Sequence, residues 1–199
     1  MKKFELTAES KINIFGKKLF RIKALISFGD VEEGETGGWI EKEENLEQSS
    51  GDAWVYGNAW VYGNAWVYGN AWVYGNARVS GNARVSGNAE VSGNARVSGN
   101  AEVYGDAEVY GDAWVYGNAR VSGNADYTTI HGFGTQFRTT TFFQCEDKQI
   151  RVSCGCFLGT IPEFREQVKN TREGKIAEEY LMIADLMEKH FVKEKESGE

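Results

Sequence analysis

Gly51-Asp52-Ala53-Trp54-Val55-Tyr56 begins a run of twelve hexapeptides that continues without a break to Ser122. Each unit follows the pattern Gly-(Asn/Asp)-Ala-x-Val-(Tyr/Ser), and a thirteenth unit starts at Gly123 but loses the pattern at Asp126. A fixed short period of this kind is typical of a chain that stacks one structural element on its neighbours. The sequence therefore predicts a solenoid.

The order of residues within one unit indicates which side chains point inward. Ala and Val are two residues apart, and in an extended chain such residues point to the same face. We expect both to fill a narrow interior, with the x residue and the Tyr or Ser outside. Gly and Asn, which tolerate left-handed backbone angles, follow each extended stretch and mark the corners.

This pattern resembles the left-handed parallel β-helix of hexapeptide-repeat proteins, in which three hexapeptides close one triangular coil. The resemblance implies a mainly β fold with three sides and about four coils over residues 51–122. The left-handed sense of the coil comes from this resemblance alone.

The outward residues give a test of the coil length, because residue i then lies over residue i+18. The three columns of x residues read Trp66, Arg84, Glu102, Arg120; then Trp60, Arg78, Arg96, Trp114; then Trp54, Trp72, Glu90, Glu108. The first column offers a cation–π pair and two salt bridges, whereas each of the others contains a like-charge pair. A coil of 12 residues also gives favourable pairs, such as Arg78 over Glu90, so this test alone does not select three sides.

The segments on either side of the repeats have the composition of small caps. Residues 1–50 alternate apolar and polar residues around Gly16-Lys17, which predicts a β-hairpin, and Trp39-Ile40 resembles an imperfect strand of the helix itself. Residues 138–145 and 150–156 predict a second hairpin. Thr160-Ile161-Pro162-Glu163 is a capping box that begins a short helix, and a second helix carries an apolar stripe from Ile176 to Phe191. We predict an N-terminal β cap over 1–50, a β-helix over 51–125, and a C-terminal hairpin with two helices over 126–199.

Two stretches carry a further resemblance. The block from Gly29-Asp30-Val31 through Gly37-Gly38-Trp39-Ile40 and Leu46 to Trp54-Val55-Tyr56 looks like the N-terminal module of phage or prophage hexapeptide proteins. It is also similar to uncharacterised bacterial proteins labelled putative acetyltransferases. The stretch from Gly155 to Thr160 resembles the C-terminal module of phage hexapeptide proteins. These resemblances imply a phage or prophage context.

The charge and composition of the chain argue against nucleic-acid and membrane partners. The chain has 199 residues and a formal net charge of −7, and no segment is basic, which argues against binding to a nucleic-acid backbone. We find neither a secretion signal nor an apolar run long enough to span a bilayer, and the chain has three cysteines, an odd number. We therefore expect no membrane partner and a location in the cytoplasm of a bacterial host cell.

Candidate catalytic and metal-binding residues lie outside the repeats. Acyl-CoA-dependent transfer in this class of fold uses a histidine base, and His131, in an expected turn after the last coil, is the candidate. Cys145, Cys154 and Cys156, if they meet across the hairpin, form a metal site with His131, but buried free thiols explain them as well. We expect no cofactor.

The outward aromatic residues form the more informative candidate site. We expect a ligand or partner to contact the aromatic residues or two arginines on the prism: Trp54, Trp60, Trp66, Trp72, Tyr56, Tyr62, Tyr68, Arg78, Arg96 and Trp114. Stacking between coils also explains the aromatic residues, while dense exposed Trp and Tyr are typical of interfaces. The two arginines could hold a phosphate.

From these features we expect a non-enzymatic binding protein that forms a homo-oligomer, a dimer or trimer. Its target is expected to be a host protein or a small anionic molecule such as a nucleotide signal. The alternatives are an acyltransferase with His131 as base and a structural spacer of a virion.

Overall fold

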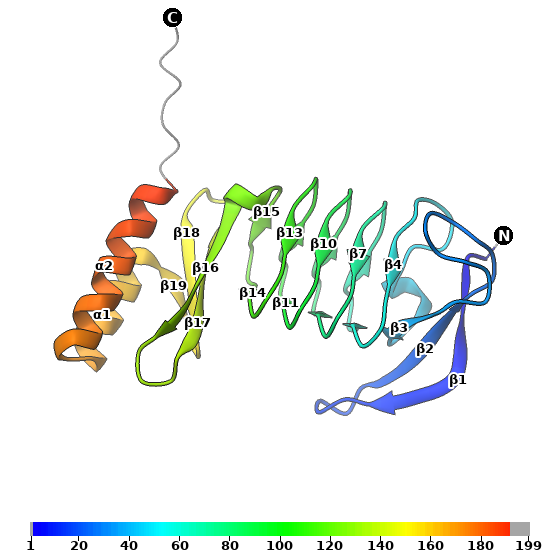
Figure 1. The fold of residues 1–199 in the computed structure, drawn as a ribbon, viewed down its shortest axis with the longest axis horizontal. Helices are drawn as coiled ribbons and strands as arrows, with labels where there is room; N and C mark the ends of the chain where they lie inside the picture. Colours follow the sequence, from blue (N-terminus) through cyan, green and yellow to red (C-terminus); the bar gives the residue numbers. More distant parts are fainter. Residues whose placement is uncertain (1, 192–199) are drawn as a thin grey trace, which may run out of the picture. The chain divides into compact units, whose positions relative to one another are not determined.

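The computed structural model describes residues 2–191, so the last eight residues of the predicted C-terminal cap lie outside the described residues (Figure 1). The described residues form two compact units, which divide between residues 124 and 125. The first unit contains the repeats and the strands before them, and the second contains a sheet and two helices. Among the described residues, none of the helices is long and apolar enough to cross a membrane.

Each of the twelve hexapeptides contributes one two-residue strand to a stack of coils (Figure 1). These strands are β4 (Trp54–Val55), β5 (Trp60–Val61), β6 (Trp66–Val67), β7 (Trp72–Val73), β8 (Arg78–Val79), β9 (Arg84–Val85), β10 (Glu90–Val91), β11 (Arg96–Val97), β12 (Glu102–Val103), β13 (Glu108–Val109), β14 (Trp114–Val115) and β15 (Arg120–Val121).

Every third strand pairs in parallel, which gives three sheets: β5-β8-β11-β14, β4-β7-β10-β13 and β6-β9-β12-β15. The register places Arg78 opposite Trp60 and Arg96 opposite Arg78, a step of 18 residues. The predicted three-sided β-helix is therefore confirmed. We name its sides the β5 face, the β4 face and the β6 face after the first repeat strand of each. The left-handed sense of the coil stays a prediction.

The interior holds the two residues that the repeat pattern placed there. The repeat alanines and valines are all buried, with at most 1% of each residue exposed. Main-chain bonds join the coils, as where the Arg78 amide donates to the Ala95 carbonyl at 2.9 Å. Asparagine side chains bond along the corners, as where Asn64 donates to Asn82 at 3.2 Å and Asn82 donates to Asn100 at 3.0 Å. The small interior explains why every unit has Ala and Val at the inward positions, and the corner bonds explain why Asn recurs at the corner.

The N-terminal segment extends the solenoid and covers its first coil. Strands β1 (Phe4–Ile12) and β2 (Lys18–Ala24) form the predicted antiparallel hairpin. Strand β3 (Thr36–Ile40) pairs in parallel with β5, which confirms that Trp39-Ile40 is a strand of the helix. The sheet of the β5 face thus contains five solenoid strands, so the coil makes about five turns.

Polar side chains of the N-terminal segment form hydrogen bonds with the unpaired main-chain carbonyls at the open end of the first coil. The buried Lys3 side chain donates to the main-chain oxygens of Gly51 at 3.1 Å and Ala53 at 3.2 Å. At the end of the 3₁₀ turn η1 (Glu43–Asn45), the side-chain amide of Asn45 donates to the Ala65 carbonyl at 2.8 Å. These bonds occupy carbonyls that no earlier coil pairs, which is what an open β-edge requires.

The second unit is a four-stranded antiparallel sheet with two helices. Its strands are β16 (Tyr127–Phe133), β17 (Arg138–Gln144), β18 (Ile150–Cys154) and β19 (Phe157–Thr160), paired in sequence order after the 3₁₀ turn η2 (Asn124–Asp126). The predicted hairpin is confirmed as β17 and β18, and β16 and β19 are additional strands.

Helices α1 (Ile161–Thr171) and α2 (Gly174–His190) follow the sheet. The predicted capping box begins α1: the Thr160 amide donates to the Glu163 carboxylate at 2.7 Å, and the Glu163 amide donates to the Thr160 hydroxyl at 3.4 Å. The apolar stripe of α2, including Tyr180 and Met187, packs with Phe142 in one core, so both predicted helices are confirmed.

Candidate ligand-binding face of the solenoid

The three faces carry different charge in their columns of outward residues. On the β6 face, Arg84 Nη1 lies 3.7 Å from Glu102 Oε1, and Arg120 also pairs with Glu102. On the β4 face, Glu90 lies opposite Glu108, which makes that column acidic. The β5 face differs from both, because its central neighbours are Arg78 and Arg96. An anion is therefore best received on the β5 face.

Aromatic rings hold the two arginines of the β5 face. The Arg78 Cζ atom lies 4.5 Å from the ring centre of Trp60, and the Arg96 Cζ atom lies 4.6 Å from that of Trp114. Within residues 2–191, neither guanidinium has an ion-pair partner. Each cation is thus oriented by a neighbouring ring while its N–H groups keep their capacity to bond an anion.

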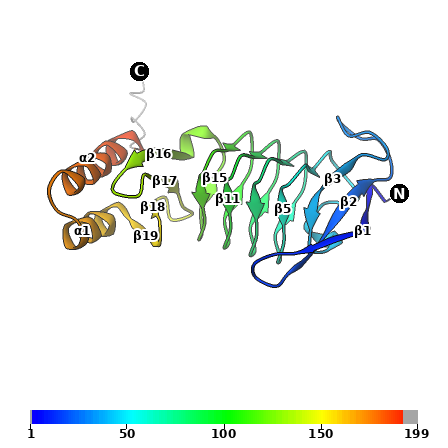
Figure 2. The same ribbon diagram turned by 60° about the horizontal axis from the view of Figure 1, so that its bottom comes forward.

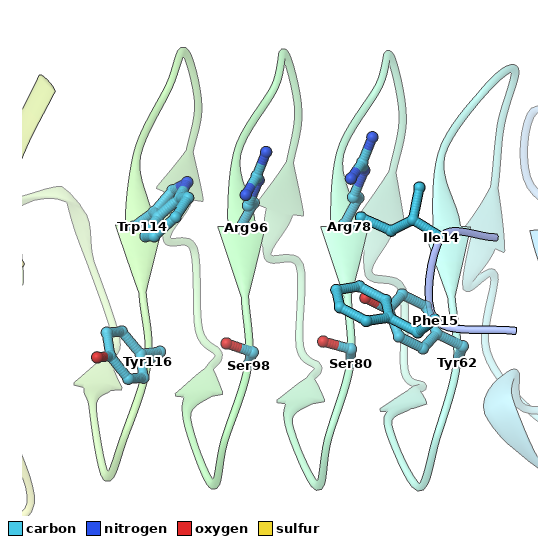
Figure 3. Close-up of a pocket in the computed structure, with 9 residues that line it drawn as sticks. All are labelled: Ile14, Phe15, Tyr62, Arg78, Ser80, Arg96, Ser98, Trp114 and Tyr116. Carbon is cyan, nitrogen blue, oxygen red and sulfur yellow. The ribbon is translucent and has the colours of Figure 1, made fainter. Parts of the chain in front are cut away.

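A second column on this face forms the floor of a hollow. It reads Tyr62, Ser80, Ser98, Tyr116, and Figure 3 shows the two serines in a row between the two tyrosines, beside the row of arginines. Because serine is small and tyrosine is large, the column is low in the middle and high at both ends. The resulting cavity has a volume of about 290 Å³.

Figure 2 shows the β1–β2 hairpin as a ribbon, and the residues at its tip complete one end of this cavity (Figure 3). Ile14 and Phe15 lie at the tip and line the cavity, and Phe15 stacks on Tyr62 with ring centres 6.4 Å apart and planes 28° apart. Two-thirds (67%) of Phe15 is exposed, so its ring is available to a ligand.

A second hollow of about 290 Å³ lies on the same face and shares both arginines. Corner side chains form the rest of its lining: Asn76, Asn94 and Asp112, together with Trp114. The amide of Asn94 donates to Asp112 at 3.0 Å. Arg78 and Arg96 therefore border two hollows, one lined by hydroxyls and rings and one lined by amides and a carboxylate.

Lys11 adds charge beside the arginines. Its ammonium lies 3.9 Å from the ring centre of Trp39 and 4.5 Å from that of Trp60. Burial, the largest cause, and the positive charges of Arg21 and Arg78 together lower the pKa of Lys11 to about 8, against the opposing effect of Glu9. The low pKa therefore reflects first the burial of the ammonium and second the positive charges of Arg21 and Arg78 at this end of the β5 face.

The structure brings together four of the predicted site residues: Tyr62, Arg78, Arg96 and Trp114. Trp60 supports the site from beneath Arg78 without lining the cavity. Trp66 and Tyr68 lie on the β6 face and stack at 4.1 Å. Tyr56 and Trp72 lie on the β4 face with ring centres 5.7 Å apart.

The prediction of Trp54 as an outward site residue is wrong. Trp54 is fully buried, because the rings of Phe4 and Phe28 from the N-terminal segment pack against it at 6.1 and 5.4 Å. It is a core residue of the first unit. The repeat pattern could not show this, since the covering residues lie outside the repeats.

Other lining residues were absent from the predicted set: Ile14, Phe15, Asn76, Ser80, Asn94, Ser98, Asp112 and Tyr116. The 18-residue step carries a signal for the serines and Tyr116, which follow Tyr62 in one column. The step also relates Asn76, Asn94 and Asp112. No repeat signal exists for the hairpin tip, because its position depends on how β1 and β2 fold back.

The candidate residues of the second unit do not converge. His131 lies on strand β16 instead of in a turn, is exposed, and has its Nδ1 atom 3.1 Å from the Thr139 hydroxyl. The alternative in which Cys145 meets Cys154 across the hairpin does not fit the register. The register places Cys154 opposite Thr140, five residues before Cys145 on the partner side, or about 17 Å along an extended chain.

All three cysteines are free thiols, and Cys145 lies apart from Cys154. Cys145 is buried, and burial raises the pKa of its thiol to about 11. Cys154 accepts a hydrogen bond from the Thr140 hydroxyl at 3.2 Å. Within residues 2–191, no group of three or more metal-ligating side chains is found.

Comparison with known proteins agrees with the architecture of the repeats. The family model of the YdcK beta solenoid repeat matches residues 53–69, 59–75, 71–87, 77–91, 89–105 and 113–125. A search of curated proteins finds no match to the chain. The matched segments and the three parallel sheets together show that the chain is a β-solenoid repeat protein.

Proposed function

We propose that this protein is a binding protein that holds a small phosphate-bearing ligand of the nucleotide class on the β5 face. The observation that carries the proposal is the stacked pair Arg78 and Arg96, which lie on adjacent strands beside a floor of serines. Two like charges at this spacing disfavour folding, and an anion between them removes that cost.

The donor groups suit a phosphate. Guanidinium groups present N–H donors in a planar fork that matches phosphate oxygens, and serine hydroxyls add single donors. Ser80 and Ser98 lie beside the two arginines in the same cavity (Figure 3). Rings at its ends, those of Tyr62 and Tyr116, offer flat apolar surface to a base, as in proteins that stack nucleobases.

The proposed role is binding without turnover, and its context is the sequestering of a host nucleotide signal. The resemblance of the caps to phage and prophage modules supports that context. Self-association as a dimer or trimer is part of the same proposal, with the exposed Trp66 of the β6 face as a candidate contact.

Isothermal titration with a nucleoside and its 5′-monophosphate tests the proposal. We expect the monophosphate to bind and the uncharged nucleoside to bind at least tenfold more weakly. The double variant Arg78→Ala/Arg96→Ala should lose the binding, whereas Arg84→Ala, at the same repeat position on the β6 face, should retain it.

Two results contradict the proposal. One is the absence of binding by any nucleotide tested. The other is binding of acetyl-CoA that survives the double arginine variant and disappears in His131→Ala, which supports the acyltransferase alternative.

A further inference from the structure

We infer that the ligand of the β5 face is a dinucleotide, with two planar bases joined through a centre that carries two phosphates. This inference rests on the proposed function and names the ligand class of the same site. It comes from the order of side chains along the face. One column reads Trp60, Arg78, Arg96, Trp114, and the column beside it reads Tyr62, Ser80, Ser98, Tyr116.

Within the four repeat coils, both columns read the same from either end; strand β3 adds a further aromatic residue, Trp39, opposite Trp60. Aromatic residues occupy the first and fourth coils, and cationic or hydroxyl residues occupy the second and third. The other faces lack this order: the β6 face reads Trp, Arg, Glu, Arg, and the β4 face reads Trp, Trp, Glu, Glu. A ligand that complements the β5 face therefore has flat groups at both ends and negative charge in the middle.

The two arginines provide two anion positions. Arg78 is held against Trp60 and Arg96 is held against Trp114, so each guanidinium is fixed by a ring on its own side of the pair. Their strands are neighbours, about 4.8 Å apart. This arrangement favours one phosphate for each guanidinium, whereas a mononucleotide with a single phosphate leaves one arginine without an anion.

The length of the cavity also exceeds a single nucleotide unit. Its lining includes Tyr62 from the first repeat coil and Tyr116 from the fourth, three strand spacings away, or about 14 Å. A base at one end and its phosphate at the nearer arginine occupy half of that length. The second half repeats the same groups in the opposite order.

The two ends are similar in kind but differ in detail. At one end Phe15 of the hairpin tip stacks on Tyr62, and at the other Trp114 accompanies Tyr116. The face therefore accepts two bases that need not be identical. Both pyrophosphate-linked and cyclic dinucleotides have the required chemistry, and the experiment distinguishes them.

The test is titration of the full chain with four probes: AMP, the one-phosphate dinucleoside ApA, pyrophosphate-linked diadenosine diphosphate, and cyclic di-AMP. We expect at least one two-phosphate probe to bind tenfold or more tightly than both AMP and ApA, with one ligand per chain. Whichever of the two binds more tightly identifies the linkage.

A matched pair of variants tests the role of the second end. Tyr116→Ser places in the fourth coil the residue that Ser98 already supplies in the third, so the solenoid should fold. We expect it to lower the affinity for the two-phosphate probe at least fivefold while changing AMP affinity less. Tyr104→Ser, at the same repeat position on the β6 face, should change neither affinity.

The outcomes separate the two proposals. If AMP and both two-phosphate probes bind equally, or if Tyr116→Ser leaves dinucleotide affinity unchanged, the dinucleotide inference is overturned while the proposed function stands. If no probe binds, both the dinucleotide inference and the proposed function are contradicted.

Discussion

Arg96 lies opposite Arg78 in the parallel register of the β5 face, so two guanidinium groups of the same sign are stacked on adjacent strands. On the β6 face the corresponding pair is Arg84 with Glu102, whose charged atoms are 3.7 Å apart. Like charges directly opposite each other destabilise a sheet, by up to about 1 kcal/mol. The β5 face is therefore less stable than the same repeat could make it.

The substitution Arg78→Glu should stabilise the fold and abolish ligand binding. It removes the repulsion from Arg96 and Lys11 and introduces attraction to both, each effect amounting to about 0.2–1 kcal/mol. It also loses the contact of Arg78 with Trp60, about 0.5–1 kcal/mol at an exposed site. The gains outweigh this single loss, so we expect the free energy of unfolding in urea to rise by up to about 1 kcal/mol.

The control for this variant is Arg84→Glu on the β6 face. It replaces an attractive pair with two opposed carboxylates, because the introduced side chain lies opposite Glu102, and it should lower the free energy of unfolding without affecting the ligand. A decrease in stability for Arg78→Glu larger than the loss of the Trp60 contact, about 0.5–1 kcal/mol, would show that the arginine pair costs the fold nothing.

Lys11 should make stability depend on pH above neutrality. Its pKa is about 8 in the folded protein and 10.5 in the unfolded chain, so between these values the unfolded chain holds more protons. Stability contributed through Lys11 therefore increases as the pH rises from about 8 to about 10.5. In Lys11→Met that increase should be missing.

Urea denaturation of both proteins at pH 7, 8, 9 and 10 measures this effect, and the difference between them isolates Lys11 from other groups that titrate there. The difference should grow in favour of the wild type as the pH rises. Curves that stay parallel across the range would show that Lys11 titrates normally.

The sequence predicted the solenoid because its period specifies both the inward residues and the corners. The Ala and Val positions, the hairpin around Gly16 and the Thr160 capping box depend on local chemistry, and all three are confirmed. The order of residues in each column follows once the coil length is 18 residues, which the resemblance implied and the strand register confirms.

What the sequence could not predict depends on long-range folding. Trp54 and Trp66 occupy the same position in their repeats, yet Trp54 is fully buried and Trp66 is 37% exposed. The difference arises from Phe4 and Phe28, which pack on Trp54 from the N-terminal segment. The position of Phe15 beside the β5 face was equally unpredictable, because it depends on how the β1–β2 hairpin folds back and this hairpin lies outside the repeats.

The contribution of a corner asparagine to stability should depend on how many hydrogen bonds its side chain forms with the asparagines of neighbouring coils. We call this row of bonded asparagines the ladder. Asn82 accepts a bond from Asn64 at 3.2 Å and donates one to Asn100 at 3.0 Å. The Asn82→Ala variant loses both, and because the corner is exposed we expect a decrease of about 1 kcal/mol in the free energy of unfolding. Asn58 occupies the same repeat position, but its side chain has no hydrogen bond among the described residues. Its alanine variant is therefore the matched control for Asn82→Ala.

In Asn58→Ala the free energy of unfolding should change by less than about 0.5 kcal/mol. Equal losses at the two positions, measured by urea denaturation, would mean that asparagine acts through its backbone preference at the corner and that the ladder adds nothing.

The corner glycines allow backbone strain to be separated from the closeness of the coils. Gly81 and Gly111 have nearly the same left-handed conformation, with φ of +70° and +67°. A Cβ atom added at Gly81 would lie 2.9 Å from the Gly99 nitrogen and 3.0 Å from its oxygen, whereas at Gly111 it would meet nothing within 4 Å. Both alanine variants incur the strain of positive φ, about 1–2 kcal/mol, but only Gly81→Ala forces two coils apart.

We therefore expect Gly81→Ala to lose about 1–3 kcal/mol more than Gly111→Ala, the range typical of overpacking. Thermal and urea denaturation of the two variants measure the difference. The neighbour that obstructs Gly81 is main chain already bonded to the Asn82 amide at 2.7 Å, so it cannot move aside as a side chain could. Equal losses would mean that the left-handed corner alone requires glycine; a larger loss at Gly81 would show that glycine also sets the spacing at which Arg78 and Arg96 meet.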